Sequence, residues 1–120
     1  MKAFMLPLRR STLAKDKVNA YLGFCVKARK IVLGLGAIDT LRGGVHLILV
    51  CSSAGKNTFK LALKYKNRFE CPLMICKCGL EYAVNKSNCK IAAVKDLNLA
   101  KAIVANACEE YEIYDGGVEN

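Results

Sequence analysis

Hydrophobic and polar positions follow one another along the chain in a pattern that predicts helices separated by short strands. Before residue 28, apolar side chains recur every three or four positions, the spacing of one helix face, at Val18, Tyr21, Leu22, Cys25 and Val26. We expect Asp16 to cap this helix, because a short acidic side chain satisfies free N–H groups at a helix start. Pro7 argues against a helix further upstream, so residues 1–13 are expected to form a basic N-terminal arm.

Short apolar runs predict the strands. Ile31–Leu33 suits an edge strand, and the longer run at residues 46–51 suits the centre of a sheet. Residues 72–76 and 91–95 predict two further strands. We therefore expect a sheet of four strands.

The segments between these runs predict the other helices, at residues 36–42, 79–84 and 96–108. A further helix is expected after Ser53, with Asn57 and Thr58 in its first turn and its end at about Phe69. Strands that alternate with helices predict an α/β fold with helices on both faces of one sheet. We expect one domain at residues 14–108, followed by an acidic tail at residues 109–120 that frays, although Tyr111, Ile113 and Tyr114 offer apolar side chains for docking.

Charge is distributed unevenly. The chain has 19 Lys and Arg against 10 Asp and Glu, and all the basic residues precede residue 102. A strongly basic body attracts polyanions, because each phosphate that Lys or Arg neutralises releases a counterion. The charge therefore predicts RNA or DNA as a partner; the alternative is that it only keeps the protein soluble.

The seven cysteines do not predict disulfides or a metal site. The N-terminal apolar run is short and broken by Pro7, and no stretch approaches the roughly 20 apolar residues of a membrane span. We therefore expect a cytoplasmic protein with reduced thiols and no membrane partner. Cys71, Cys76, Cys78 and Cys89 lack the paired C-x-x-C spacing of zinc sites, so core packing is favoured over metal or redox use.

Residues that enzymes commonly use are sparse. His46 is the single histidine, and no pair of carboxylates stands at a spacing typical of acid–base catalysis. Gly34 and Gly36 supply only part of a dinucleotide-binding fingerprint, because Asp39 stands where its third glycine belongs. We therefore expect no catalytic residue, no cofactor and no enzymatic activity.

A helix start flanked by Gly34 and Gly36 is the expected binding surface. Glycine lets the backbone turn sharply and lets another group approach closely. The free N–H groups of a helix start attract anions, and Lys27, Arg29 and Lys30 lie just upstream. We predict that this helix start receives the phosphate backbone of RNA.

Several motifs occur in a characteristic order: KIVLG at 30–34, RGG at 42–44, LILV at 47–50, SAGKNT at 53–58, GLEYAV at 79–84, IAAVKD at 91–96 and LAK at 99–101. In this order the chain resembles the kink-turn RNA-binding ribosomal-protein family (the L-seven-Ae / L-thirty-e type), and within it the short YlxQ-like bacterial proteins. The resemblance extends over about residues 18–107.

The resemblance implies a three-layer α-β-α sandwich around a four-stranded mixed sheet, without catalysis. It also implies RNA binding through the helix after the glycine and through the loop before the last strand, here about residues 85–90. Together with the basic residues, the expected RNA-binding set is Lys27, Arg29, Lys30, Gly34, Leu35, Gly36, Lys56, Lys86, Asn88, Cys89 and Lys90. We therefore expect a monomeric, ribosome-associated ribonucleoprotein component.

The chain departs from the family at one place. Family members have polar side chains directly after the entry residues, where this chain has Gly36 and Ala37, and Thr40 stands where a lysine follows. This predicts contacts to phosphates without base reading by these side chains. Two alternatives stay open: a protein-interaction module of the same fold, and a substrate-recognition domain that works with a separate catalytic partner.

Overall fold

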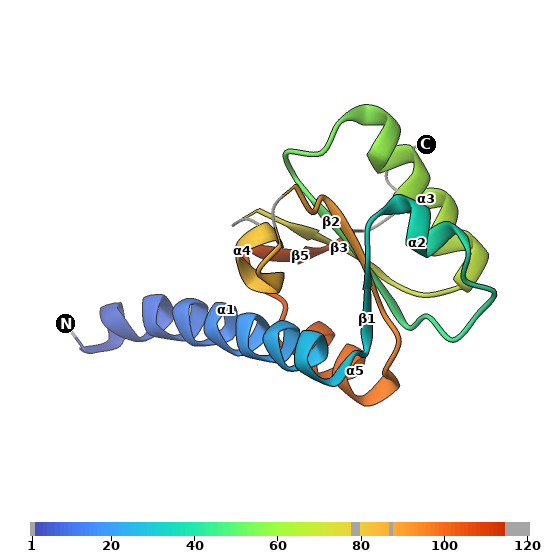
Figure 1. Ribbon diagram of the computed structural model, residues 1–120. Helices are drawn as coiled ribbons and strands as arrows, with labels where there is room; N and C mark the ends of the chain where they lie inside the picture. Colours follow the sequence, from blue (N-terminus) through green and yellow to red (C-terminus); the bar gives the residue numbers. More distant parts are fainter. Residues whose placement is uncertain (1, 78–79, 87, 115–120) are drawn as a thin grey trace.

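The computed structural model describes residues 2–77, 80–86 and 88–114, with side chains from residue 14 onward (Figure 1). The described strands are β1 (Ile31–Leu33), β2 (Leu47–Cys51), β3 (Leu73–Cys76), β4 (Ile91–Val94) and β5 (Tyr111–Ile113). They form one sheet in the order β1-β4-β2-β3-β5. Only β2 and β3 are parallel among the described pairs, so the sheet is mixed, with β2 at its centre and β1 at its edge as predicted.

Helices cover both faces of the sheet (Figure 1). The described helices are α1 (Lys2–Ala28), α2 (Leu35–Asp39), α3 (Lys56–Phe69), α4 (Leu80–Val84) and α5 (Leu97–Ala105). Residues of α1, α4 and α5 pack with Leu47, Leu49 and Cys51 of β2, whereas α2 and α3 pack with Ile48 and Val50. Successive side chains of a strand point to opposite faces, so the continuous apolar run of β2 fills two separate cores.

The sheet has a fifth strand where the sequence predicted a fraying tail. Tyr111 is completely buried, and its hydroxyl donates a hydrogen bond to the Asn19 side chain in α1. Glu112 faces solvent between two inward residues, and its carboxylate lies 2.9 Å from the Lys77 ammonium. The prediction of four strands is therefore wrong, because the alternation in β5 is only three residues long. The predicted domain boundary at residue 108 falls before this strand, and residues 115–120 of the predicted tail lie outside the described residues.

The first helix is longer than predicted. α1 runs from Lys2 to Ala28, so most of the predicted arm at residues 1–13 is helical, and Asp16 lies inside the helix and not at its cap. The helix continues through Pro7, although proline beyond the first turn removes one backbone hydrogen bond and crowds the carbonyl four residues earlier. The predicted stripe is confirmed, with Val18 and Leu22 fully buried.

Other helix ends also differ from the predictions. α2 ends at Asp39 rather than Arg42, and Arg68 from α3 donates hydrogen bonds to the backbone oxygens of Asp39 and Leu41. A side chain distant in sequence therefore takes the carbonyl groups that a longer helix would use. Gly79, predicted to begin α4, lies outside the described residues. No helix in the part of the chain that the structure describes combines the length and apolarity needed to cross a membrane.

Candidate nucleic-acid interface

One end of the sheet gathers segments that are far apart in sequence. The carboxyl ends of β1, β2 and β3 lie there beside the beginnings of β4 and β5. The Gly34 N–H donates to the Ile91 oxygen at 3.1 Å, and the Cys51 N–H donates to the Lys90 oxygen at 2.8 Å. We refer to this region as the Gly34 end: it contains the first turns of α2 and α3 and the loop at residues 85–90.

Gly34 sets the direction of α2. Its φ of 93° and ψ of 150° lie in a region that residues with a Cβ rarely adopt. A Cβ at this position would meet nothing within 4 Å, so the turn requires glycine for its backbone conformation rather than for a close contact. The turn leaves Leu35 half-buried and Gly36 exposed in the first turn of α2, where backbone N–H groups lack intrahelical partners.

Among the described residues of the loop at residues 85–90, Asn85, Lys86 and Asn88 are exposed and Cys89 is buried. Asn85 and Asn88 have φ values of 54° and 57°, the left-handed conformation that asparagine tolerates better than most residues. The Lys86 N–H donates to the Glu81 oxygen at 3.0 Å and so ends α4. These turns leave Lys86 and Asn88 exposed and Cys89 2% exposed. Cys89 is thus a core residue beneath the predicted RNA-binding loop.

Lys90 is already engaged within the protein. Its ammonium nitrogen donates to Ser53 Oγ at 3.0 Å and lies 3.5 Å from Glu81 Oε2. Ser53 Oγ lies 3.0 Å from the Cys51 sulfur. Because Glu81 balances part of its charge, Lys90 is a weaker candidate for a phosphate contact than the exposed Lys86.

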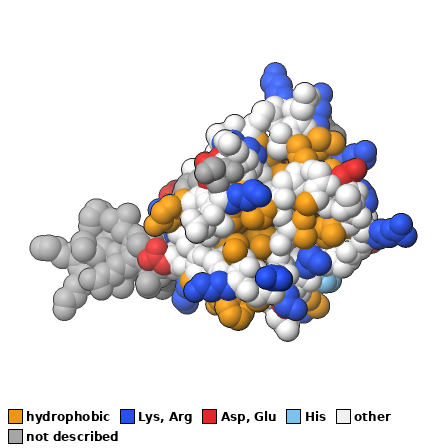
Figure 2. All heavy atoms as spheres, viewed as in Figure 1, with side chains coloured by type: hydrophobic (Ala, Val, Ile, Leu, Met, Phe, Trp, Pro, Cys, Tyr) orange, Lys and Arg blue, Asp and Glu red, His pale blue; other side chains and the backbone are white. Residues whose placement is uncertain are grey.

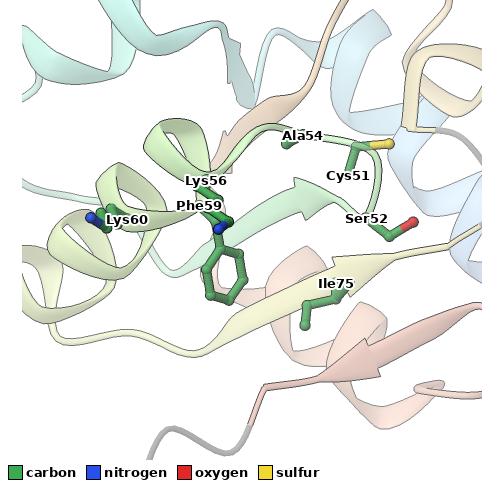
Figure 3. A pocket seen from close by; sticks show the side chains of 7 residues that line it. All are labelled: Cys51, Ser52, Ala54, Lys56, Phe59, Lys60 and Ile75. Carbon is green, nitrogen blue, oxygen red and sulfur yellow. The ribbon is translucent and has the colours of Figure 1, made fainter. Parts of the chain in front are cut away.

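Lys56 begins α3 beside an apolar cavity of about 470 Å³ (Figure 3). The Phe59 ring extends from α3 toward β3, and Ile75 of β3 forms another part of the wall (Figure 3). Lys56 and Lys60 also line the cavity, and both are exposed. The Gly34 end therefore combines cations with an accessible apolar surface.

Basic residues recur every fourth position along α3 and form a stripe that divides into two parts. Lys56, Lys60 and Lys64 are exposed. Arg68, by contrast, lies 3.6 Å from the Asp39 carboxylate and stacks over the Phe69 ring at 5.0 Å. Arg68 therefore holds α2 against α3, which leaves only the first three turns of the stripe for an external partner.

Three predicted residues lie elsewhere. The Lys30 oxygen accepts a hydrogen bond from the Lys95 N–H at 2.7 Å, which fixes it at the opposite end of β1 from Gly34. Lys27 and Arg29 lie before Lys30 at that far end, where Arg29 has a φ of 60°. A strand rises about 3.3 Å per residue, so roughly 13 Å of extended chain separates Lys30 from Gly34. The structure brings together the other eight predicted residues and leaves these three apart.

The sequence analysis missed Ser53 and Glu81, which hold Lys90 in place. They belong to the β2–α3 connection and to α4, and Ser53 is 37 residues from Lys90. Contacts of this separation leave no local spacing signal. The two residues become evident only from the antiparallel pairing of β2 with β4.

The described cysteines do not converge on a metal site. Cys71 is buried on the α2/α3 face, whereas Cys76 and Cys89 are buried on the opposite face, and Cys78 lies outside the described residues. Within the described ranges, no group of three or more His, Cys, Asp or Glu side chains is arranged to hold a metal ion. Burial raises the pKa of the Cys25 and Cys71 thiols to about 11, as expected of core cysteines.

Comparisons with known proteins support the fold alone. No family model matches the chain, and no curated protein matches it. Among solved structures it is similar to a protein with unknown function from Bacillus halodurans C, with a TM-score of 0.64 and 24% sequence identity. The match covers 75% of this chain and 95% of that chain. At this level of identity, the likeness indicates a shared α/β architecture.

Proposed function

We propose that the protein is a non-catalytic RNA-binding protein that receives the phosphate backbone of a bent, structured RNA at its Gly34 end. The single observation that supports this most is the meeting of three segments there: the first turn of α2, the first turn of α3 and the loop at residues 85–90. Hydrogen bonds from Gly34 to Ile91 and from Cys51 to Lys90 join the strands that carry them. The family resemblance implicates two of these three segments, the start of α2 and the loop at residues 85–90. The start of α3 is the third.

The electrostatics of this end suit a polyanion. Lys56 and Lys86 are exposed and form no ion pair with another described residue. Gly55 precedes α3 without a side-chain cap, so the first N–H groups of that helix are not satisfied by a capping side chain. Free N–H groups and unpaired ammonium groups both bind phosphate oxygens.

The proposed mode of recognition is shape rather than base sequence. Gly36 and Ala37 are exposed at the helix start and have no polar side chain to read a base edge. Structured RNA is recognised largely through backbone shape and unstacked bases, so contacts to crowded phosphates at a bend suffice for selectivity. The resemblance to ribosomal kink-turn binders adds a kink-turn-like bend and a ribosomal setting to the proposal.

A salt titration with matched variants tests this function. We expect a kink-turn RNA to bind more tightly than a plain duplex of equal length in a fluorescence anisotropy titration, and log K to fall linearly with log salt concentration. Substituting Lys56→Gln and Lys86→Gln together should reduce the magnitude of that slope by about 1.5, since each phosphate contact contributes about 0.7–0.9.

The far end of β1 supplies the control. A triple variant, Lys27→Gln with Arg29→Gln and Lys30→Gln, removes more charge than the double variant but from a site outside the proposed contact. At physiological salt the Debye length is about 8 Å, so its effect on a short RNA should be smaller. Binding that is independent of salt, or a greater loss in the triple variant, contradicts the proposal.

One observation favours a second function, that of a protein-interaction module. Figure 2 shows hydrophobic side chains in the middle of one face, with Lys and Arg around them. Ile31, Val32 and Leu33 of the edge strand β1, and Leu35 after it, are only half-buried. An edge strand with apolar neighbours can pair with a strand of another protein. Pull-down from a lysate separates the two functions: partners that survive ribonuclease treatment support this one.

A further inference from the structure

Cys51 occupies an unusual position for a buried thiol. It ends β2 at the Gly34 end and is 6% exposed. Its sulfur lies 3.0 Å from Ser53 Oγ, which accepts a hydrogen bond from the Lys90 ammonium at the same distance. An ammonium group can only donate, so the Ser53 hydroxyl hydrogen remains available to the Cys51 sulfur.

This environment stabilises a thiolate. Burial by itself raises the pKa of Cys51, but hydrogen bonds from the Ser53 hydroxyl and from the N–H groups of Ser53 and Leu80, with the charge of Lys90, lower it below its ordinary value of 9.0. Burial instead raises the pKa of Cys25, Cys71, Cys89 and Cys108. Cys51 therefore differs from these other thiols in its surroundings, since hydrogen-bond donors converge on its sulfur.

A second thiol lies in the same core. Cys89 belongs to the same buried cluster as Cys51. Burial raises the pKa of Cys89, and the charges of Glu81 and then Cys51 add smaller contributions in the same direction. The Cys51 N–H donates to the oxygen of Lys90, the residue after Cys89. This bond makes Lys90 the residue opposite Cys51 in the antiparallel register, and Cys89 is one residue beyond that pair. A disulfide requires Cα atoms about 4.4–6.8 Å apart, so Cys89 reaches Cys51 by an adjustment of the segment that precedes β4.

Cys89 is a better partner for Cys51 than Cys76 is. Cys76 stands opposite Cys51 in the parallel register, but it lies inside β3, which is paired on both sides with β2 and β5. Cys89 precedes β4 and follows Asn88, a residue with left-handed φ in the connecting loop. Because Cys89 lies outside the ladder, its backbone can move into disulfide geometry with the loss of fewer backbone hydrogen bonds than a movement of Cys76 would cause.

We propose that Cys51 and Cys89 form a redox-sensitive thiol pair that a hydroperoxide converts into a disulfide beneath the loop at residues 85–90. The Cys51 thiolate attacks the terminal peroxide oxygen, the O–O bond breaks, and the alkoxide or hydroxide that leaves takes a proton from solvent or from Lys90 through Ser53. The Cys89 thiol then attacks the resulting sulfenic sulfur, forms the S–S bond and releases water. The peroxide gains two electrons, and the two thiols lose them.

The disulfide would tie the RNA-binding loop to the end of β2. Lys86 and Asn88 precede Cys89 directly, so a bond at Cys89 restricts the backbone that presents them. This part of the inference rests on the proposed RNA-binding function, whereas the thiol pair itself does not. We expect the oxidised protein to differ from the reduced protein in RNA affinity about fivefold or more, the lower range of typical coupling between sites.

Oxidation of the folded wild-type protein tests the pair without any substitution. Reduced protein is treated with hydrogen peroxide, remaining thiols are blocked with N-ethylmaleimide, and peptides are mapped by mass spectrometry without reduction. We expect a peptide pair joined through Cys51 and Cys89, which dithiothreitol separates. A bond from Cys51 to Cys76, or an unmodified Cys51 in protein that remains folded, overturns the proposal.

Variants extend the test to mechanism. Cys89→Ser should leave Cys51 as a sulfenic acid that dimedone traps, while the matched Cys76→Ser should still form the disulfide. Ser53→Ala should shift the pH at which Cys51 reacts half-maximally with iodoacetamide upward; an unchanged pH profile contradicts the role of Ser53.

Equal RNA affinity of oxidised and reduced protein removes only the regulatory link, and the absence of RNA binding in both forms removes the proposed function but leaves the thiol pair intact.

Discussion

Gly34 illustrates how a single residue positions the candidate interface. Its φ of 93° turns the chain from β1 into α2, while its N–H donates to Ile91 at the start of β4. The sequence analysis predicted a glycine-dependent turn here, and the positive φ confirms it. The open space around the missing Cβ does not follow from the sequence, because it depends on packing from other elements.

Substitution of Gly34 separates backbone strain from contact. Gly34→Ala should lower the free energy of unfolding by about 1–3 kcal/mol, the typical cost of holding a residue with a side chain in a sparsely populated region. Gly36→Ala is the matched control, because Gly36 lies inside α2 with open space around it and without a positive φ. That change should stabilise the protein by about 0.5–1 kcal/mol. Urea unfolding measures both; equal effects of the two substitutions would show that the Gly34 turn is unstrained.

The sequence predicted which side chains are buried better than it predicted the chemical surroundings of the Cys51 thiol. The apolar periodicity correctly identified Val18, Leu22 and Cys25 as buried. The same reasoning treated Cys51 as one more core cysteine, because its hydrogen-bond donors come from Ser53 and Leu80 and a nearby positive charge comes from Lys90, on three separate segments. Burial follows from local pattern, whereas the surroundings of a thiol follow from tertiary packing.

At the scale of elements, the predictions succeeded where an apolar run was continuous, as in β1 and β2, and failed where it was interrupted. The central strand β2 has five consecutive buried residues and was predicted correctly. β5 has three residues with exposed Glu112 in the middle, in a segment whose acidic composition suggested a tail. α1 contains Pro7 within its 27 residues, and local propensity underestimated how far the helix extends.

β5 should matter to stability in proportion to the burial of Tyr111. Tyr111→Ala should reduce the free energy of unfolding by about 3–5 kcal/mol, as for other large aromatic residues removed from cores. Glu112→Ala in the same strand is the control. This substitution breaks the ion pair with Lys77. Both side chains of the pair are at least half exposed, so we expect the free energy of unfolding to fall by only about 0–1 kcal/mol. A small effect of Tyr111→Ala in denaturant unfolding would mean that β5 is peripheral to the fold.

At the scale of the whole molecule, the candidate interface depends on the direction of each strand. Lys27, Arg29 and Lys30 are close to Gly34 in sequence, but β1 carries the chain away from them before the turn. Conversely, Lys86 and Lys56 are distant from Gly34 in sequence, and antiparallel pairing brings their segments to its end of the sheet. Sequence proximity alone therefore grouped Lys27, Arg29 and Lys30 with Gly34, whereas the fold puts them at the opposite end of β1.

A buried cysteine in each of the two cores makes the protein lose stability as the pH rises into the alkaline range. Cys25 lies in one core and Cys71 in the other, and burial raises both pKa values from 9.0 to about 11. The folded state therefore holds these protons more tightly than the unfolded state. Their contribution is fully present below pH 9 and is lost as pH rises to 11, by up to about 2–3 kcal/mol for each thiol.

Urea unfolding between pH 8 and 11 measures this loss. Cys25→Ala should make the decline shallower than in the wild-type protein. Val18→Ala, a substitution at a buried residue of the same helix that does not titrate, should lower stability by a similar amount at every pH and leave the slope unchanged. A slope unaffected by Cys25→Ala would show that other groups cause the alkaline loss.

The position of β5 along the chain has a consequence for synthesis. Its partner β3 is made some 35 residues earlier, so during translation β3 emerges with one edge unpaired and without the aromatic side chain that fills the core beside it. At roughly 5–20 residues per second, this incomplete state lasts several seconds. Until β5 leaves the ribosomal exit tunnel, the nascent sheet presents an open edge on which chaperones or neighbouring chains can act.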